Sequence, residues 1–462
     1  MYKKQSHIHF VGIGGIGMSG IATILAYQGY QISGCDLDMS QQSVKNLQSI
    51  GCIITEGHNS KACQDKSIDI IVYSSAVKSN NPEIIEAQKR GIPIIPRALM
   101  LAELMRTKYS IAIAGSHGKT TTTSMISHIL MEARLDPTLI IGGHLKSISN
   151  NAKFGLGDFL VAEADESDRS LTHLHATIAI LTNIDLEHLE TYKDFEDIKD
   201  TFKKFLNNIP FYGKAIVCIE DQGIQEILPI PHIKIIKYGL SNKANIWADD
   251  INLESSHSTF NVYKDDKLLG KINLNIPGQH NVLNALAAIT LGLDLELSFE
   301  TIYKALKSFK GVERRFSYHG VTKNGAEIFD DYGHHPNEIL NTLLIAHKRA
   351  KNKLRVIFQP HRYTRTEKLW QQFIDTFKNN PVDELIITDI YPASETPIED
   401  ITAENFVKDF LKQNPNFPIR YLPFDKTFSN FIDYINNNAQ QDDLVLLLGA
   451  GKLNLIASRV VY

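Results

Sequence analysis

The sequence predicts an α/β protein of three domains, and three observations support this fold class. A chain of 462 residues is too long for one hydrophobic core. Short apolar runs typical of buried strands alternate with helical patterns, which favours parallel sheets covered by helices. The composition, 43% apolar and 22% charged, is that of an ordinary globular protein. We expect domains at 1–106, 107–311 and 312–462.

The strands expected from these apolar runs are spread over all three domains. In chain order they lie within 7–22, at 31–35, 70–73, 111–113, 159–162 and 178–181, in a β-rich stretch at 235–276, and at 354–358, 384–388 and 444–448. Helical patterns lie between them. The first and third domains therefore resemble Rossmann-like units, with alternating strands and helices.

A glycine pattern opens the first domain. Gly12-x-Gly14-x-x-Gly17 follows a strand and begins a helix, and Asp36 lies nineteen residues past Gly17 at the end of the next strand. This is the spacing of a dinucleotide-binding turn, in which glycines let the backbone approach a pyrophosphate. The pattern predicts a diphosphate near Gly14 to Ser19. NAD and a UDP-sugar satisfy it equally well.

A second turn, AGSHGKTTTTS at 114–124, joins the strand at 111–113 to a helical pattern. Backbone N–H groups of such a turn converge on one point, and the positive end of the helix dipole adds to them. Lys119 is then placed to meet the outer phosphates of a nucleotide, and Thr120 to offer its hydroxyl to Mg²⁺. Position 113 is Ile where the full pattern has glycine, so the loop is shortened. We expect a P-loop ATPase-like central domain.

Two acidic motifs follow strands of the central domain. VAEADESD at 161–168 gathers four carboxylates, which indicates a cation or a cationic substrate: Glu163, Asp165, Glu166 and Asp168. TNIDLEHLETY at 182–192 contains His188, a candidate metal ligand.

Further polar clusters occur towards the C-terminus. PGQHNVLNALAA at 277–288 places two asparagines on one helix face beside a histidine, which suits an adenine edge. GVERRF at 311–316 places arginines at a domain junction, where they could close onto a phosphoryl group. DDYGHHPNEI at 330–339 and FQPHRYTRT at 358–366 follow strands, and Arg362 and Arg365 could hold a carboxylate.

Composition excludes several classes of function. A net charge of −4 gives no basic face for nucleic acid. No apolar run reaches the ~20 residues of a membrane span, and Met1 to Lys4 lead into a strand without a signal peptide, so we expect a cytoplasmic protein. The four cysteines lack CxxC spacing, which predicts neither a zinc site nor a disulfide framework: Cys35, Cys52, Cys63 and Cys218.

In this order, the motifs resemble those of the Mur ligase family over essentially the whole chain. They are GIGGIGMSGIA, GSHGKTTTTS, EADESD, TNIDLEH, GQHNVLNA, GVERRF, DDYGHHP and QPHRYTRT. Within the family they are most similar to members that join L-alanine to UDP-N-acetylmuramate. The resemblance implies that the first domain binds UDP-N-acetylmuramate, the central one ATP with Mg²⁺, and the third L-alanine. It favours the UDP-sugar over NAD in the first domain.

The resemblance also implies roles for individual residues. The ATP site would comprise Gly115, Ser116, His117, Gly118, Lys119, Thr120, Thr121, His280, Asn281, Asn284, Arg315 and Asp331. The metal would be held by Thr120, Glu163 and His188. The UDP-muramate site would comprise Gly14, Gly15, Ile16, Gly17, Ser19, Asp36, Ser74 and Ser75, and the alanine site Tyr332, His334, Arg362 and Arg365. The residues expected to act in catalysis are Lys119, His188, Arg315, His334, Arg362 and Arg365.

The implied reaction is ATP-dependent ligation of L-alanine to the lactyl carboxylate of UDP-N-acetylmuramate through an acyl phosphate. A monomer or homodimer is expected. Three alternatives remain: a ligase that recycles a tripeptide, an NAD-dependent oxidoreductase and a non-catalytic nucleotide sensor. Ser167 stands where we associate a Tyr with the recycling ligase, and Ser116 where a Thr is usual. Glu187 could supply a carboxylate beside the metal, and Lys452-Leu453-Asn454 departs from the small polar residues expected there.

Overall fold

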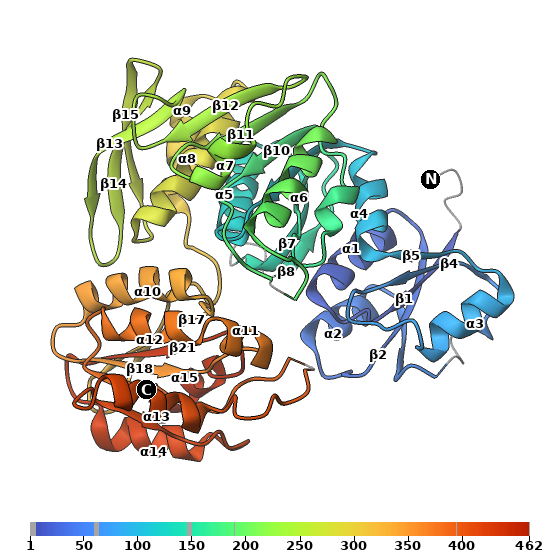
Figure 1. Cartoon of the computed structure of the whole chain (residues 1–462). Coiled ribbons are helices and arrows are strands. Elements are labelled where there is room, and N and C mark those ends of the chain that lie inside the picture. Colours follow the sequence, from blue (N-terminus) through green and yellow to red (C-terminus); the bar gives the residue numbers. More distant parts are fainter. Residues whose placement is uncertain (1–5, 60–63, 146–149, 189, 394, 462) are drawn as a thin grey trace.

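The computed structural model describes residues 6–59, 64–145, 150–188, 190–393 and 395–461. Cys63 and the segment Met1 to Lys4 lie outside these ranges. Three sheets, each covered by helices, form three α/β domains (Figure 1). The expected fold class is confirmed.

The N-terminal sheet is entirely parallel, in the order β3-β2-β1-β4-β5. The strand order changes direction between β1 and β4, where doubly wound sheets open a crevice for ligands. Its strands are β1 (His7–Val11), β2 (Gln31–Asp36), β3 (Ile53–Glu56), β4 (Ile68–Tyr73) and β5 (Ile94–Pro96). Its helices are α1 (Ile16–Tyr27), α2 (Gln42–Ser49), α3 (Pro82–Arg90) and α4 (Arg97–Met105).

The central sheet has the order β15-β14-β13-β12-β11-β10-β6-β9-β7-β8. Its strands are β6 (Tyr109–Ala114), β7 (Thr138–Leu145), β8 (Asn150–Lys153), β9 (Phe159–Glu163), β10 (Ile178–Leu181), β11 (Lys214–Cys218), β12 (Lys234–Gly239), β13 (Ile246–Leu253), β14 (Ser258–Lys264) and β15 (Lys267–Leu274). The helices are α5 (Lys119–Glu132), α6 (Phe195–Asn207), α7 (Gln222–Ile227), α8 (Gln279–Asp294), α9 (Phe299–Ser308) and the short 3₁₀ helix Ser170–His173. Because β9 and β10 flank β6 in parallel, the phosphate loop and both acidic motifs emerge at one edge.

The C-terminal sheet has the order β16-β17-β21-β18-β19-β20, and only β16 is antiparallel to its neighbour. Its strands are β16 (Ser317–Val321), β17 (Glu327–Asp331), β18 (Leu354–Phe358), β19 (Glu384–Ile387), β20 (Ile419–Tyr421) and β21 (Leu444–Leu448). The helices are α10 (Pro336–Arg349), α11 (Tyr363–Lys368), α12 (Trp370–Lys378), α13 (Ala403–Gln413), α14 (Ser429–Asn438) and α15 (Asn454–Val460). The motifs DDYGHHP and QPHRYTRT leave the carboxyl ends of β17 and β18, on either side of β21.

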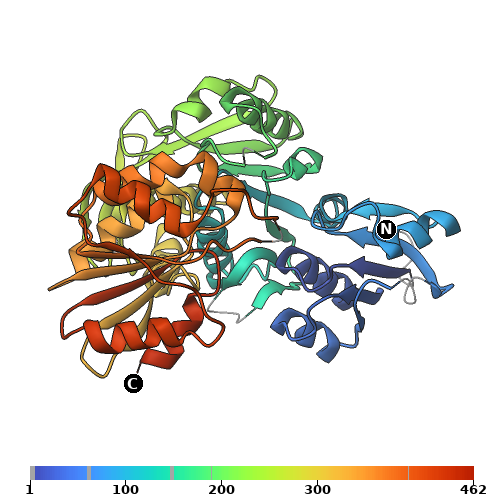
Figure 2. The same ribbon diagram turned by 60° about the horizontal axis from the view of Figure 1, so that its bottom comes forward.

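The hydrophobic core is shared unequally among the domains. One continuous cluster spans the N-terminal and central domains, where α1 packs on β7 and β8. The C-terminal domain has separate clusters on the two faces of its sheet. Leu453 belongs to one of them and is 1% exposed, which accounts for an apolar residue in the unusual Lys452-Leu453-Asn454 stretch. Figure 2 shows the N-terminal domain standing to one side of the other two.

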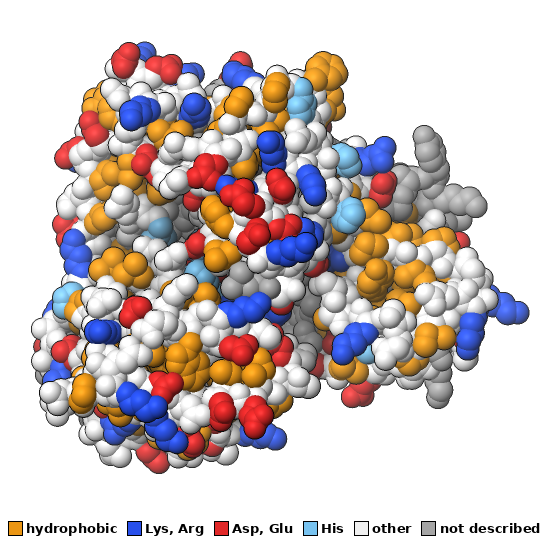
Figure 3. Space-filling view, in the orientation of Figure 1, with side chains coloured by type: hydrophobic (Ala, Val, Ile, Leu, Met, Phe, Trp, Pro, Cys, Tyr) orange, Lys and Arg blue, Asp and Glu red, His pale blue; other side chains and the backbone are white. Residues whose placement is uncertain are grey.

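The surface is mixed in charge. Acidic and basic side chains are interspersed on the face seen in Figure 3. Among the described residues, no helix combines the length and the apolar character that crossing a membrane requires.

Candidate active site

The phosphate loop joins β6 to α5 and depends on two glycines with positive φ. Gly115 has φ 134°, and a Cβ there would lie 2.1 Å from Thr182 Oγ1. Gly118 has φ 82°, and its Cβ would lie 2.5 Å from Asn284 Oδ1. No other residue type fits either position without strain. The loop therefore turns sharply into the N-terminus of α5, where a helix favours anions.

Lys119 is held by the loop and by one acid. Its Nζ donates to the carbonyl oxygens of Gly115 and Ser116 at 2.5 and 3.1 Å, and to Glu166 Oε1 at 2.7 Å. Burial lowers the pKa of Lys119, but the charge and hydrogen bond of Glu166, together with the charges of Glu187 and Asp165, outweigh this effect and raise the pKa. The lysine is therefore a fixed cation at the phosphate loop.

The predicted metal residues fall into two neighbouring groups. Thr120 donates to Glu163 Oε2 at 3.2 Å, and burial raises the pKa of the Glu163 carboxyl. His188 instead faces Glu166, with Nε2 3.4 Å from Oε1. Its ring also lies within 4.8 Å of the Glu187 carboxylate, so Glu166, Glu187 and His188 could hold a cation.

The four acids of VAEADESD have different partners. Arg97 from α4 donates to Asp165 at 3.1 Å. Asp168 accepts from the Ser170 backbone N–H at 2.9 Å. Glu163 and Glu166 also have protein partners, but Glu166 Oε2 is buried without one among the described residues, so Glu166 is the acid of this motif with an atom left for a cation.

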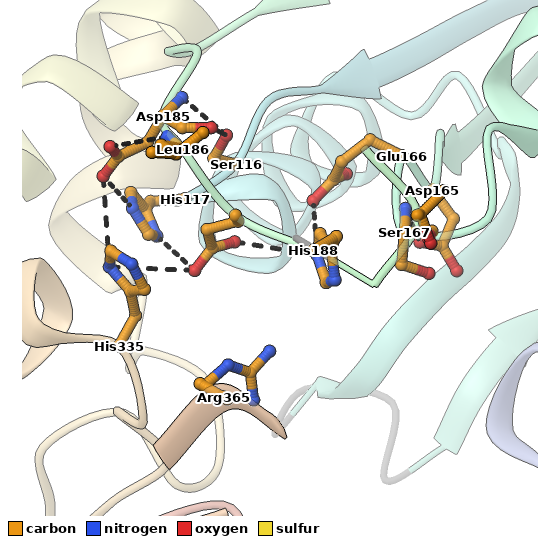
Figure 4. A network of polar contacts seen from close by, with 12 residues as sticks. Ser116, His117, Asp165, Glu166, Ser167, Asp185, Leu186, His188, His335 and Arg365 are labelled. Atoms are coloured by element: carbon orange, nitrogen blue, oxygen red, sulfur yellow. Dashed lines mark hydrogen bonds and ion pairs between the residues drawn. The ribbon is translucent and has the colours of Figure 1, made fainter. Parts of the chain in front are cut away.

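A network of histidines and acids links the phosphate loop to the C-terminal domain (Figure 4). His117 Nε2 lies 2.9 Å from Asp185 Oδ2, and His335, just before α10, packs 5.2 Å from the His117 ring. Glu187 lies 3.8 Å from a ring nitrogen of each histidine. Burial lowers the pKa of His117, but Glu187 and Asp185 outweigh it and raise the pKa to about 10. His117 is therefore a second cation at the loop.

The predicted adenine residues line a cleft of about 710 Å³ between the central and C-terminal domains. The predicted ATP residues in its walls are His117, Gly118, Thr121, His280, Asn281, Asn284, Arg315 and Asp331. Arg315 donates to Glu338 at 3.2 Å. Asp331 accepts from the N–H groups of Phe316 and Gly333, and burial raises its pKa to about 6.

The predicted alanine residues lie at the C-terminal side of the same interface. Tyr332 lies beneath Arg315, 5.6 Å from ring centre to guanidinium carbon. His334 packs on His361 at 5.4 Å, and Arg365 lies 3.2 Å from the His361 ring. Arg362 reaches the central domain, where it donates to Glu190 at 3.2 Å. The two arginines thus have different partners in this state.

The glycine turn of the N-terminal domain is closed by Asp36. The Gly14 N–H donates to Asp36 Oδ2 at 2.7 Å, and the carboxylate is buried. Ser19, on α1, accepts from Asn151 at 3.2 Å. Ser74 follows β4, with Oγ 3.1 Å from where a Gly12 Cβ would lie, and Ser75 comes next in the chain. Asp36 therefore shapes the turn, whatever ligand the turn binds.

Each of the three parts of the chain matches the model of a known protein family. Residues 7–109 match the Mur ligase family catalytic domain, 113–292 the Mur ligase middle domain, and 314–451 the Mur ligase glutamate ligase domain. The chain belongs to the Mur ligase family.

Relatives of this Mur ligase match it over nearly its whole length. A UDP-N-acetylmuramate–L-alanine ligase of Syntrophus aciditrophicus is 46% identical over 99% of this chain and 93% of its own. One of Geotalea daltonii is 48% identical over 98% and 97%. The solved UDP-N-acetylmuramate-alanine ligase of Thermotoga maritima superposes with a TM-score of 0.80 at 28% identity, covering 98% of both chains. A murein peptide ligase of Psychrobacter arcticus, at 24% identity and a TM-score of 0.73 over 98% of both chains, shares the fold.

Sequence reasoning missed several residues of the site in this Mur ligase. Glu338 accepts from Arg315 and from the His334 N–H. Burial raises the pKa of Glu338, but Arg315, His334 and His117 together outweigh this effect and hold the pKa well below the usual range. His335 and Glu338 lie within DDYGHHPNEI, so this motif was a signal that could have identified them. Arg97 lies beside Gly17 as well as Asp165. Nothing in the sequence distinguishes Arg97 from other arginines at the start of a predicted helix.

Strained backbone marks four residues of the site. His188, Arg314, Phe316 and Arg362 have φ of 54°, 58°, 43° and 70°, a region that non-glycine residues rarely occupy. Such strain persists only where surrounding contacts impose it, and it concentrates at functional sites. Two of the four, His188 and Arg362, are residues whose catalytic roles we expected from the motifs.

Proposed function

We propose that this chain joins L-alanine to the lactyl carboxylate of UDP-N-acetylmuramate with ATP, giving UDP-N-acetylmuramoyl-L-alanine, ADP and phosphate for peptidoglycan synthesis. The observation that carries this function is the full-length identity of 46–48% to relatives named for that reaction. The site supports it, because a phosphate loop, buried acids and arginines of a second domain converge on one interdomain cleft.

The chemistry explains the need for ATP. A carboxylate oxygen is a poor leaving group, so the muramate carboxylate first attacks the γ-phosphorus and ADP leaves. The amine of alanine then attacks the acyl carbon of the acyl phosphate, and phosphate leaves. Lys119 and Arg315 supply positive charge to the phosphoryl group. Closure of the domains excludes water, which would hydrolyse the acyl phosphate.

Mg²⁺ is the cation that these residues fit. Glu163 and Thr120 offer hard oxygen ligands, and their oxygen atoms lie 3.2 Å apart. Burial raises the pKa of the Glu163 carboxyl, and a bound cation would offset this effect by stabilising the carboxylate. His188 with Glu166 forms the adjoining candidate site. When bound, the metal neutralises charge on the phosphates. Within the protein, Glu163 and Thr120 would position that charge beside Lys119.

The three domains divide the substrates between them. We assign UDP-N-acetylmuramate to 1–106, ATP to 107–311 and L-alanine to 312–462. Gly14 to Ser19 would bind the diphosphate, with Arg97 as a nearby cation. Tyr332, His334, Arg362 and Arg365 would surround alanine. The protein is expected to act in the cytoplasm as a monomer or homodimer.

A single assay distinguishes this reaction from its rivals. Phosphate release is measured with ATP, Mg²⁺ and UDP-N-acetylmuramate against single amino acids and the tripeptide L-alanyl-D-glutamyl-diaminopimelate, with mass spectrometry of the product. We expect the highest kcat/KM with L-alanine. A preference for the tripeptide would favour the recycling ligase. Tighter calorimetric binding of NADH than of UDP-N-acetylmuramate would favour the oxidoreductase.

A further inference from the structure

A buried cluster in the N-terminal domain lies on the α3 side of the sheet, away from the ATP cleft. Cys35 from β2, His9 from β1 and Glu83 from the first turn of α3 each offer one ligand atom within 4.8 Å of the others. All three are fully buried. His58, which follows β3, places Nδ1 3.1 Å from Cys35 Sγ. Soft sulfur, imidazole and carboxylate together are the ligand set of Zn²⁺.

A chain of hydrogen bonds fixes which nitrogen of His9 is free to bind. Asp65 is a carboxylate, so Ser67 Oγ donates to it, at 2.8 Å, and accepts from His7 Nδ1, at 2.7 Å. The other ring nitrogen of His7, Nε2, lies 2.7 Å from Ser33 Oγ.

The chain of hydrogen bonds ends at His9. Ser33 Oγ also lies 2.8 Å from His9 Nδ1, so this nitrogen already has a hydrogen-bond partner. Nε2 is the ring nitrogen of His9 that remains to bind a metal ion. That atom is buried and has no hydrogen-bond partner among the described residues. Histidines that bind metals are commonly oriented in this way, by donating their other N–H to a fixed partner.

We propose that His9, Cys35 and Glu83, with His58 as a fourth ligand, bind Zn²⁺ and tie α3 to β1 and β2. A thiolate and a carboxylate would balance the two charges of the ion, so the bound site is neutral in a buried environment. Ligand atoms of tetrahedral zinc lie about 3.5 Å apart. The atoms of His9, Cys35 and Glu83, which lie within 4.8 Å of one another, would draw together on binding, and the ring of His58 would move towards them.

Cobalt substitution of the full-length protein tests this site directly. Co²⁺ bound by a thiolate gives a charge-transfer band in the near ultraviolet. Neither cluster beside the phosphate loop contains a cysteine, so metal bound there gives no such band. We expect the wild type to show the band at one Co²⁺ per chain, and Zn²⁺ to displace the cobalt with a Kd below about 1 µM.

Matched variants assign the ligands. Cys35→Ser should abolish the band, whereas Cys52→Ser, which replaces another buried thiol of the same domain, should keep it. His9→Gln retains the thiol and should weaken zinc binding by more than the ~10–100-fold that loss of an outer-shell partner costs, with an unchanged circular dichroism spectrum. Absence of the band in the wild type, or its persistence in Cys35→Ser, would overturn the proposal.

Discussion

Replacement of Lys119 by methionine separates the catalytic from the structural role of this lysine. Methionine keeps most of the stem and removes the charge that meets the outer phosphates. Loss of one preorganised donor to a developing charge lowers kcat about 10²–10³-fold, and a full charge at a transferring phosphoryl group belongs at the upper end of that range. We expect phosphate release to fall at least about a thousandfold.

The same substitution has a cost in stability that the structure lets us estimate. Glu166 has a side chain 3% exposed and would lose its partner at 2.7 Å. Breaking a buried ion pair costs about 3–5 kcal/mol. His188 remains 3.4 Å away, and hydrogen bonds to Glu166 and Glu190 outweigh burial and raise its pKa to about 9. We therefore expect about 3 kcal/mol, or a fall in Tm of about 3–5 °C for a unit at least as large as the two domains that share one core.

A second variant distinguishes the two effects. Lys119→Met combined with Glu166→Gln removes the unpaired charge, so the Tm should recover by several degrees while phosphate release stays at the level of the single variant. Calorimetry and the phosphate assay on both proteins give the comparison. Retention of more than a tenth of wild-type activity by either variant would refute the assignment of Lys119 to the phosphates.

Three further predictions follow from the site. The free energy of unfolding should decrease as pH rises from 6.5 to about 9, because folded His188 keeps a proton that the unfolded chain releases near 6.5; denaturant titrations across this range should give a flatter profile for His188→Gln. Arg365→Ala should raise the KM for alanine about tenfold to a hundredfold with little change in the KM for ATP, and Arg459→Ala, on α15, serves as the control; an unchanged alanine KM would remove Arg365 from the alanine site. Glu163→Gln should raise the Mg²⁺ concentration needed for half-maximal activity, and excess chelator should abolish wild-type turnover; an unchanged metal optimum would contradict this ligand.

The regular elements were predictable because each follows a local pattern. The run at 111–113 falls within β6, and the helical pattern after the phosphate loop is α5. Parallel pairing of β9, β6 and β10 then brings motifs some 50 residues apart to one edge, as alternating strands and helices imply. The family could also be recognised from the motifs. Each motif follows a particular strand, so the order of the motifs in the sequence reflects the order of strands along the chain.

Pairings across domains were not predictable, because no local pattern encodes them. Arg362 could be recognised as a cationic residue after β18, but its contact with Glu190 depends on how two domains meet. The same holds for His335, which is buried against His117 rather than solvated. Asp36 shows a different limit: its ligand contact stays a prediction, and the spacing gave no sign that the carboxylate also closes the Gly14 turn.

The contacts across the ATP cleft explain how substrate charge can drive closure of the C-terminal domain. That domain has its own hydrophobic clusters, so its position depends on polar contacts such as Asn337 to Asp185 and Arg362 to Glu190, which rearrange more easily than a shared apolar core. Arg315 pairs with Glu338, and Lys119 pairs with Glu166. A phosphate bound in the cleft would compete with both carboxylates for the same cations. We therefore propose that ligand binding exchanges these two acids for phosphate as partners of the proposed catalytic cations.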